Sequence, residues 1–298
     1  MKLAPQARIA FQGERGAFSE EAALKLAGPD AVLVPRPSFE AAFSAIDEGL
    51  ADYILAPIEN SLAGSVHRSF DLLVESDLQI IGEVIISIVH NLIALPGAPM
   101  SKLQVVESHP VALAQCERFF IAHPGLKRVA AEDTAGSVRE MMNLADPARA
   151  AIASKRAAEI YGGEILQEHL EDDRENYTRF LLLALSTTAN PTLDSAGHSI
   201  EKLSLVFELA HLPGALYHAL APFANRNINM MKIESRPIRG KPWQYRFHLD
   251  LQASTKNPEV QAAIAELRQL SAQLRILGSY QAAETAPDNS VSSTEKSR

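Results

Sequence analysis

The chain has 298 residues, a net charge of −8 and a single cysteine, and 47% of its residues are hydrophobic. This length is typical of about two domains, and the hydrophobic fraction is that of an ordinary soluble protein with a core of its own. An acidic surface repels phosphate backbones, which argues against a nucleic-acid partner. One cysteine excludes an intrachain disulfide and fits a reducing cytoplasm; Cys116 lies in a helical pattern, where a buried, unreactive thiol is expected.

We expect no segment that enters or crosses a membrane. The opening residues Met1–Pro5 run directly into a strand-like segment, unlike a secretory signal. The longest apolar run, Ile80–Leu95, is interrupted by Glu83 and His90, among others, and therefore does not resemble a membrane span.

The first two-thirds of the chain alternates between β-rich runs and amphipathic helical stretches. The expected strands are Arg8–Phe11, Ala31–Val34, Tyr53–Pro57, Leu78–Leu95, Val105–Glu107, Arg128–Ala131, Ala150–Ala153, Ile165–Leu170 and Thr178–Leu185. The expected helices are Gly16–Leu26, Ser38–Glu48 with Ser38 as N-cap, Ser65–Leu73, Val111–Phe120, Gly136–Leu144 and Lys155–Tyr161. This alternation predicts an α/β region, residues 6–186, of two lobes with mostly parallel sheets and a cleft between them. The segment Leu78–Leu95 is long enough to cross from one lobe to the other.

The pattern changes after residue 186. Residues 187–200 are small and polar and predict a linker. Residues 201–280 predict the order βαββαβ, which is a ferredoxin-like unit. Its strands are expected at Leu203–Leu209, Met230–Ser235, Tyr245–Leu251 and Leu274–Gly278, and its helices at Leu216–Phe223 and from Pro258 onward after the N-cap Asn257. Residues 281–298 have almost no large apolar side chains and predict a disordered tail.

Sequence motifs for metal or nucleotide binding are missing. The sequence has no phosphate loop, no full dinucleotide glycine pattern, no His-Glu-x-x-His and no cysteine pair, and its nine histidines lack ligand spacing. We therefore expect no cofactor and no metal.

Polar residues instead follow the predicted strands, where α/β folds bind their ligands. Pro57–Ser61 ends a buried strand and precedes a helix, so its backbone N–H groups and the side chains of Asn60 and Ser61 can hold an anion. A plain capping turn explains the same residues about as well. Ser108 and Gln115 are two helical turns apart and would share one polar face, although ordinary helix-surface chemistry is the default interpretation.

Two further polar segments follow later strands. Asp133–Ser137 by itself predicts only an N-cap. In Asn176–Phe180, Arg179 opens the very apolar run Leu181–Leu185, and a buried arginine is unfavourable unless it is paired. The acids at Glu171–Asp173 can pair it; the alternative is a bidentate grip on a substrate carboxylate.

At these residues the chain closely resembles the prephenate dehydratase family, over essentially all of Arg8–Tyr280. Three motifs of the catalytic region stand at Pro57–Ser61, Ser108–Gln115 and Thr178–Phe180. The C-terminal part is similar to an ACT domain and carries the two phenylalanine-binding motifs of the family, at Gly214–Leu216 and Glu234–Pro237. Each motif is short, but five in the right order make a specific match.

The chain departs from the family pattern in two places. Asp133-Thr134-Ala135-Gly136 stands where the family has Ser-Thr-Ala-Glu, so only Thr134 and Ala135 carry over. Tyr177 stands where the family often has Thr. No chorismate mutase helix bundle precedes Arg8, which implies the monofunctional form.

The resemblance implies a two-lobed, periplasmic-binding-protein-like catalytic region followed by the ferredoxin-like ACT domain. It implies a cytoplasmic lyase of the shikimate/chorismate pathway that needs no cofactor. This enzyme removes carbon dioxide and water from prephenate and gives phenylpyruvate for phenylalanine biosynthesis. The resemblance also implies feedback regulation by phenylalanine and a homodimer or homotetramer formed through ACT domains.

The resemblance also assigns roles to single residues. The catalytic residues would be Thr178, Asn60, Ser108 and Gln115. The substrate-binding residues would be Arg179, Phe180, Ser61, Thr134 and Glu59. Thr178 would donate a hydrogen bond or a proton to the departing hydroxyl. Arg179 would bind the pyruvyl carboxylate, and Phe180 would pack against the substrate ring. The phenylalanine-binding residues would be Gly214, Ala215, Leu216, Glu234, Ser235, Arg236 and Pro237. Here Gly214 would let the backbone approach the effector, and Glu234 would meet its amino group.

Two other functions fit the same sequence. Arogenate dehydratase acts on a substrate with an amino group in place of the keto oxygen, and the motifs do not separate the two enzymes. A non-catalytic amino-acid or solute sensor would also combine a two-lobed cleft with an amino-acid-binding domain. The expected lack of a signal peptide argues against a periplasmic sensor of this kind.

Overall fold

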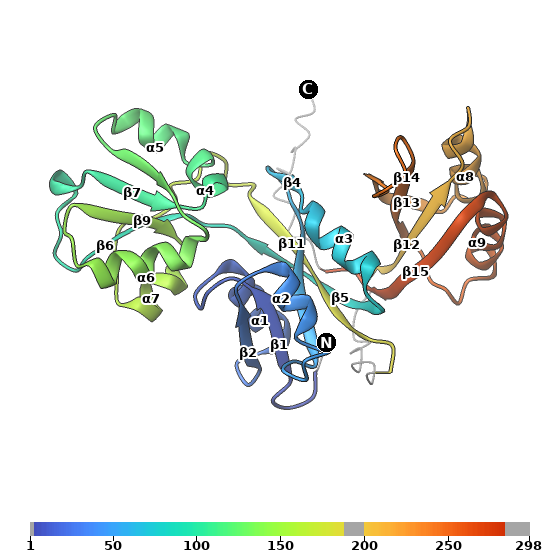
Figure 1. Cartoon of the computed structure of the whole chain (residues 1–298), viewed down its shortest axis with the longest axis horizontal. Helices are drawn as coiled ribbons and strands as arrows, with labels where there is room; N and C mark the ends of the chain where they lie inside the picture. Colours follow the sequence, from blue (N-terminus) through green and yellow to red (C-terminus); the bar gives the residue numbers. More distant parts are fainter. Residues whose placement is uncertain (1–2, 188–199, 284–298) are drawn as a thin grey trace, which may run out of the picture.

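The computed structural model describes residues 3–187 and 200–283. Within these ranges the chain forms two α/β lobes and a C-terminal α/β domain, with lobe 1 in the middle (Figure 1). The predicted linker 187–200 and the predicted tail 281–298 lie outside the described residues except at their ends. None of the helices in the described ranges is both long and apolar enough to cross a membrane.

Lobe 1 is built on a sheet with the strand order β2-β1-β3-β11-β5, and the short β4 pairs with β3. Its elements are β1 Arg8–Gln12, α1 Phe18–Ala27, β2 Val32–Arg36, α2 Phe39–Ser44, β3 Tyr53–Asn60, β4 Gly64–Ser65, α3 His67–Glu75, β5 Leu78–Ser87 and β11 Tyr177–Leu185. Helix α1 packs on one face, whereas α2 and α3 pack on the other. Burial on both faces explains why β3 and β11 are continuous apolar runs in the sequence. Ser38 caps α2 as predicted, because its Oγ accepts a hydrogen bond from the Ala41 N–H at 3.1 Å.

Lobe 2 has the strand order β10-β6-β9-β7-β8. Its elements are β6 Asn91–Ala94, the 3₁₀ turn Met100–Lys102, β7 Val105–Ser108, α4 Pro110–Ala114, α5 Glu117–Ala122, β8 Lys127–Ala130, α6 Thr134–Leu144, β9 Arg149–Ala153, α7 Lys155–Tyr161 and β10 Glu164–Gln167. The predicted single helix Val111–Phe120 is wrong, since the chain breaks it into α4 and α5. The carboxylate of Asp172 accepts hydrogen bonds from the backbone N–H groups of Glu117 and Arg118, and so caps a new helix at this point.

The chain crosses between the lobes twice, at residues 88–90 and 168–176. The first crossing lies within the predicted segment Leu78–Leu95, which forms β5 and β6. The second crossing returns the chain to lobe 1, where β11 inserts between β3 and β5 and runs antiparallel to both. Each main sheet therefore contains both parallel and antiparallel pairs, and the expectation of mostly parallel sheets is corrected to mixed sheets.

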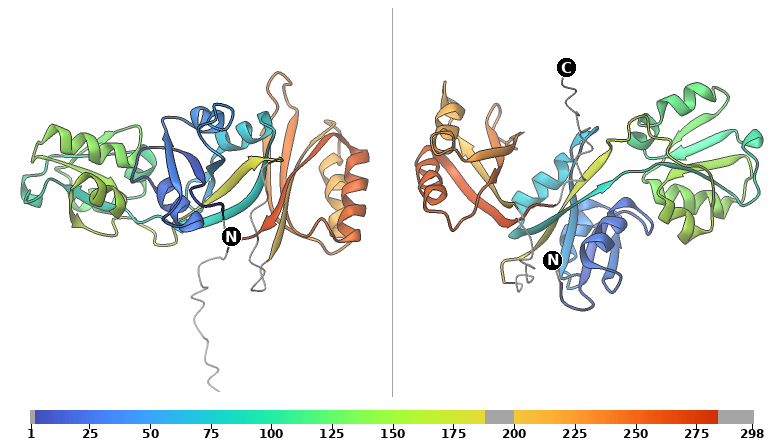
Figure 2. Two further views of the ribbon diagram at one scale, coloured as in Figure 1. Left: turned by 90° about the horizontal axis from the view of Figure 1, so that it is seen from below. Right: turned by 180° about the vertical axis from the view of Figure 1, so that it is seen from behind.

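The C-terminal domain has the predicted order βαββαβ and an antiparallel sheet ordered β13-β14-β12-β15. Its elements are β12 Glu201–Leu209, α8 Ala215–Ala224, β13 Asn229–Pro237, β14 Tyr245–Gln252, α9 Pro258–Leu270 and β15 Ser271–Gln281. Asn257 caps α9 as predicted. The two helices cover one face of the sheet, and the other face lies against lobe 1 (Figure 2). At this interface the ring of His248 contacts Phe70 of α3, with 4.7 Å between the ring centroids.

Candidate active site

A cavity of about 440 Å³ lies between the two lobes, and both lobes line it. Most of the residues that line it lie at or just after the carboxyl ends of β1, β3, β7 and β8, which is where α/β folds bind ligands. Five of the predicted site residues belong to its lining: Asn60, Gln115, Thr134, Thr178 and Phe180. The structure therefore brings together in one cavity residues that are more than 110 positions apart in the chain.

Side-chain hydrogen bonds join the centre of this cavity across both lobes. Asn60 Nδ2 donates to Thr178 Oγ1 at 2.9 Å and to Asn176 Oδ1 at 2.8 Å. Asn176 Nδ2 donates to Gln115 Oε1 at 3.0 Å, and Gln115 Nε2 donates to Asn60 Oδ1 at 3.3 Å. His90 Nε2 lies 2.9 Å from Gln115 Oε1. We call these five side chains the amide network.

The amide network leaves the proton of the Thr178 hydroxyl available to a ligand. Because Thr178 Oγ1 accepts from Asn60, its own O–H bond must point elsewhere. No protein acceptor among the described residues takes this proton, and Thr178 is 9% exposed as a residue and lines the cavity. A donated hydrogen bond also polarises the hydroxyl and strengthens it as a donor. Thr178 is therefore arranged to donate to a group bound in the cavity.

Two serines predicted to act in the site have structural roles instead. Ser108 is fully buried, and its Oγ donates to the Ile152 carbonyl at 2.6 Å. Ser61 Oγ donates to the Glu175 carbonyl at 2.7 Å and accepts from the Tyr177 N–H at 2.9 Å, which joins the end of β3 to the start of β11. Neither serine lines the cavity. The shared face predicted for Ser108 and Gln115 also does not exist, because Ser108 ends a strand.

Arg179 points away from the cavity. Side chains alternate along a strand, so Thr178 and Phe180 face the cavity while Arg179 faces the C-terminal domain. This alternation corrects the prediction that Arg179 grips a substrate carboxylate.

The guanidinium of Arg179 is held by three carboxylates. It lies 3.2 Å from Glu59, 3.1 Å from Glu83 and 3.0 Å from Asp250 of the C-terminal domain. Burial lowers the pKa of Arg179, but these charges outweigh burial and raise the pKa above its ordinary value. Pairing was foreseen as the alternative to substrate binding, but with the acids Glu171–Asp173 rather than with these partners. Glu59, predicted to bind substrate, belongs to this ion cluster and does not line the cavity.

The charged groups of the cavity are acidic. Glu132 and Asp133 line it, and no lysine or arginine is among the described residues that line it. Burial lowers the pKa of both His90 and His109, so these side chains are neutral near pH 7. Any carboxylate of a ligand must therefore be held by backbone and side-chain dipoles rather than by a cationic side chain.

Several polar residues of this site were not predicted from the sequence, among them His90, His109 and Asn176. His109 and Asn176 stand inside motifs that were recognised, and their positions beside Ser108 and Thr178 were the available signal. His90 stands in the middle of an apolar run and had no signal of its own. It enters the site only because the first crossing between the lobes brings it beside Gln115.

The predicted effector motifs lie on both sides of the C-terminal sheet. Gly214 precedes α8 with φ of 78°, a left-handed conformation that favours glycine. Ala215 and Leu216 line a small hollow of about 160 Å³ that also includes Phe247. Ser235 pairs with Phe247 across β13 and β14 and so faces the same side.

The other residues of the second motif face lobe 1. The Glu234 carboxylate accepts a hydrogen bond from Ser65 Oγ at 2.6 Å, and Arg236 pairs with Asp71 of α3 at 3.0 Å. Glu234 is therefore directed at lobe 1 and away from the hollow beside Ala215 and Leu216. Pro237 ends β13.

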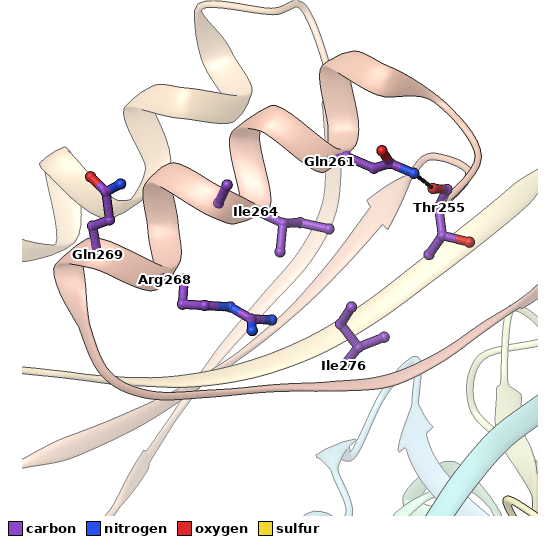
Figure 3. Close-up of a pocket in the computed structure, with 7 residues that line it drawn as sticks. Thr255, Gln261, Ile264, Arg268, Gln269 and Ile276 are labelled. Carbon is purple, nitrogen blue, oxygen red and sulfur yellow. Dashed lines mark hydrogen bonds between the residues drawn. The ribbon is translucent and has the colours of Figure 1, made fainter.

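A second hollow of about 590 Å³ lies on the outer side of the C-terminal domain, between α9 and β15 (Figure 3). Gln261 spans one end and donates to the Thr255 carbonyl at 2.9 Å, while Ile264, Arg268 and Ile276 form its floor and rim (Figure 3). None of the predicted site residues lines it. The cavity between the lobes therefore remains the candidate active site.

Comparison with known proteins decides the family. A family model described as prephenate dehydratase matches residues 9–188. The chain belongs to the prephenate dehydratase family. It is therefore an enzyme of the lyase-type dehydratases, and the family serves phenylalanine biosynthesis.

Relatives of this family resemble the chain over most of its length. A chloroplastic arogenate dehydratase/prephenate dehydratase of Arabidopsis thaliana is 44% identical over 92% of this chain and 72% of its own. The prephenate dehydratase of Arthrobacter aurescens in complex with L-Phe is 32% identical, with a TM-score of 0.81, over 92% of this chain and 89% of that one. GqqA, described as a novel type of quorum quenching acylase, is 34% identical with the same TM-score, over 92% and 98% of the two chains.

Proposed function

We propose that the protein converts prephenate to phenylpyruvate, carbon dioxide and water, and that the reaction takes place in the cavity between the lobes. The observation that carries this proposal is the Thr178 hydroxyl, which accepts from Asn60 and keeps its own proton free to donate into the cavity. Loss of a ring hydroxyl needs such a donor at the departing oxygen.

The proposed reaction breaks two bonds of the ring. The bond between the ring and its carboxylate breaks, and its electron pair forms the last double bond of the aromatic ring as carbon dioxide leaves. The bond between the ring and the hydroxyl breaks at the other side, and this oxygen leaves as water after taking up one proton. Thr178 donates toward this oxygen, and because a threonine hydroxyl is a weak acid, the proton comes finally from solvent. Asn60 stabilises the charge that develops on Thr178 Oγ1.

The carboxylate lost as carbon dioxide fits a cavity without cations. A lysine or arginine on this group would stabilise the charged ground state more than the transition state, in which the charge is leaving. The lining supplies uncharged hydrogen-bond donors instead, such as the hydroxyl of Thr134 and the backbone N–H groups in the first turn of α6. Phe180 and Phe18 provide apolar surface for the ring.

A second candidate substrate is arogenate. Arogenate carries an ammonium group in place of the keto oxygen, so its net charge is less negative than that of prephenate. The acidic side chains Glu132 and Asp133, with no cation among the described residues that line the cavity, favour the less negative substrate. The Arabidopsis relative is named for both activities.

Parallel assays on the two substrates test the proposal. Prephenate turnover is followed by the absorbance of phenylpyruvate, and arogenate turnover by phenylalanine on a chromatogram. A higher kcat/KM for prephenate supports the first candidate and a higher value for arogenate supports the second. If the folded protein turns over neither substrate, both candidate activities are refuted, and a non-catalytic sensor remains as the alternative function.

The acylase description of GqqA is not extended to this chain. An acylase that forms a covalent intermediate needs a nucleophile activated by a neighbouring base. Within the described residues, neither His90 nor His109 forms a hydrogen bond to a serine or threonine hydroxyl. The cavity residues therefore support dehydration better than acyl transfer.

We also propose that phenylalanine regulates the enzyme through the C-terminal domain, as an ACT domain. The hollow beside Ala215 and Leu216 supports an apolar ligand, and the Arthrobacter structure holds L-Phe. Strand β13 links this region to the cavity, because Glu234 and Lys232 both contact Ser65, which lines the cavity. Phenylalanine bound at one end of β13 would shift this wall and change substrate affinity. If saturating phenylalanine leaves kcat and KM unchanged, the regulatory proposal is wrong.

A homodimer or homotetramer through the C-terminal domains completes the proposal. Large apolar side chains are exposed on this domain at Leu212, Tyr217, Met231, Ile233 and Trp243. Such side chains favour burial between subunits. The single, buried cysteine is compatible with a cytoplasmic location. Light scattering at several protein concentrations measures the oligomer directly.

A further inference from the structure

His90 lies in the first crossing between the two lobes, residues 88–90 between β5 and β6. Its side chain is almost fully buried, lines the cavity and meets the ring of Phe18 edge-on, with 5.7 Å between centroids. Its backbone N–H donates to the buried carboxylate of Glu171 at 2.8 Å, on the second crossing between the lobes. The position of His90 is thus determined by both crossings.

Backbone groups determine the orientation of the amides beside His90. The N–H groups of Leu62 and Ala63 donate to Asn60 Oδ1 at 3.0 and 2.8 Å, so this atom must be the carbonyl oxygen. The Gln115 atom that faces Asn60 Oδ1 must then be a donor, which is Nε2. The carbonyl oxygen of Gln115 therefore faces His90.

The orientation of Gln115 determines the tautomer of His90. Since Gln115 Oε1 can only accept, His90 Nε2 must carry the hydrogen. The ring is neutral, and Nδ1 holds a lone pair. Within the described part of the chain, this buried Nδ1 has no hydrogen-bond partner. An unpaired buried acceptor reduces the stability of the folded state. An apolar side chain would therefore pack better at this position, and packing alone does not explain a histidine here.

We propose that His90 is a positioning residue for the dehydration step, acting through Gln115. Its Nε2–H holds the Gln115 carbonyl, which keeps Nε2 of Gln115 on Asn60 Oδ1. Asn60 then presents Nδ2 to Thr178, and the Thr178 proton remains free for the substrate. Without the His90 donor, the Gln115 carbonyl is held by Asn176 Nδ2 alone, at 3.0 Å, so the Gln115 amide is less restrained. An amide turned over would present its oxygen to Asn60 Oδ1, and this repulsion would misorient the donor of Thr178. The inference rests on the proposed function.

Three variants separate this role from packing. His90→Phe keeps an aromatic ring against Phe18 and removes the donor, His90→Leu removes both, and His90→Gln keeps an N–H near the position of Nε2. We expect His90→Phe to lower kcat about 3- to 10-fold, the effect of one neutral hydrogen bond, with KM changed less than about 2-fold. We expect His90→Gln to recover most of the lost kcat. His123→Leu, at a histidine that does not line the cavity, is the matched control.

A double-mutant cycle tests whether the effect passes through Gln115. In the Gln115→Ala background, His90→Phe should lower kcat no further. Additive losses, or a His90→Gln variant as slow as His90→Phe, would overturn the inference. Turnover of prephenate or arogenate by the unchanged protein is measured first. A protein without turnover refutes the proposed function, whereas an active protein with a fully active His90→Phe variant refutes only the role of His90. If His90→Phe does not fold, the same comparisons are made with His90→Leu.

Discussion

Replacing Thr178 with valine tests the centre of the proposed mechanism. Valine has the shape of threonine, so the substitution exchanges a hydroxyl for a methyl group and leaves the packing of β11 unchanged. The variant loses the proton that would be donated to the leaving oxygen. Removing one such donor lowers kcat about 10²- to 10⁴-fold in other enzymes, which corresponds to about 3–5 kcal/mol of transition-state stabilisation.

The structure also gives the expected effect on stability. Asn60 Nδ2 loses one acceptor in Thr178→Val, but it keeps Asn176 Oδ1 at 2.8 Å and the Tyr177 carbonyl at 3.1 Å. Because the donor remains partnered, the free energy of unfolding should fall by only about 1 kcal/mol. Activity and stability are therefore expected to respond very differently to the same substitution.

The assay follows phenylpyruvate absorbance with prephenate and, in parallel, urea denaturation of the same samples. Thr178→Ser is the matched control, since it keeps the hydroxyl and should stay within about 10-fold of the unchanged protein. We expect Thr178→Val to lower kcat with little change in KM, because the hydrogen bond strengthens in the transition state. A Thr178→Val variant with a kcat within about threefold of the unchanged enzyme would remove Thr178 from the mechanism.

Three other predictions follow from the burial of charged and reactive groups. Arg179→Met removes the cation shared by three carboxylates: Glu83 keeps Lys202 and Glu59 keeps Lys232, but Asp250 loses its ion-pair partner. The free energy of unfolding should fall by about 3–5 kcal/mol. A KM raised more than about 10-fold at unchanged stability would instead indicate that Arg179 binds the substrate. The pKa of His248 is lowered from 6.5 to about 4, first by burial and second by the positive charge of Arg246. Between these two pH values the unfolded chain therefore binds a proton at His248 that the folded chain does not. The free energy of unfolding should then fall by up to about 3 kcal/mol as the pH drops from 6.5 to 4, and urea titrations should show a smaller fall in His248→Gln. Burial raises the pKa of the Cys116 thiol, so a thiol reagent at pH 8 should modify it only after denaturation, and rapid reaction of the native protein would contradict its burial.

Local sequence signals predicted most of the elements. Helix caps at Ser38 and Asn257 are short-range features, because the capping side chain accepts a hydrogen bond from a backbone N–H only two or three residues away. Strand periodicity in the C-terminal domain was equally local and led to the correct order of elements. The prediction of a single helix at Val111–Phe120 was wrong because Asp172, which caps the new helix α5, lies more than 50 residues away in the sequence.

The candidate site was predicted in part for the same reason. Asn60, Gln115 and Thr178 stand in motifs that can be recognised locally, and they share the cavity. Arg179 was assigned to the wrong side, because the partners that hold its guanidinium come from other strands and from the C-terminal domain. His90 could not be found at all, since a histidine in an apolar run has no local mark of function.

The amino-acid sequence by itself determined the order of the elements, the family motifs and the acidic net charge of the chain, because these depend on neighbouring residues and on composition. Only the tertiary structure decided which face of β11 meets the cavity, which acids hold Arg179 and how His90 reaches Gln115. Each of these depends on a register between strands or on a crossing between lobes. Such pairings are set by the packing of distant segments, and no local pattern encodes them.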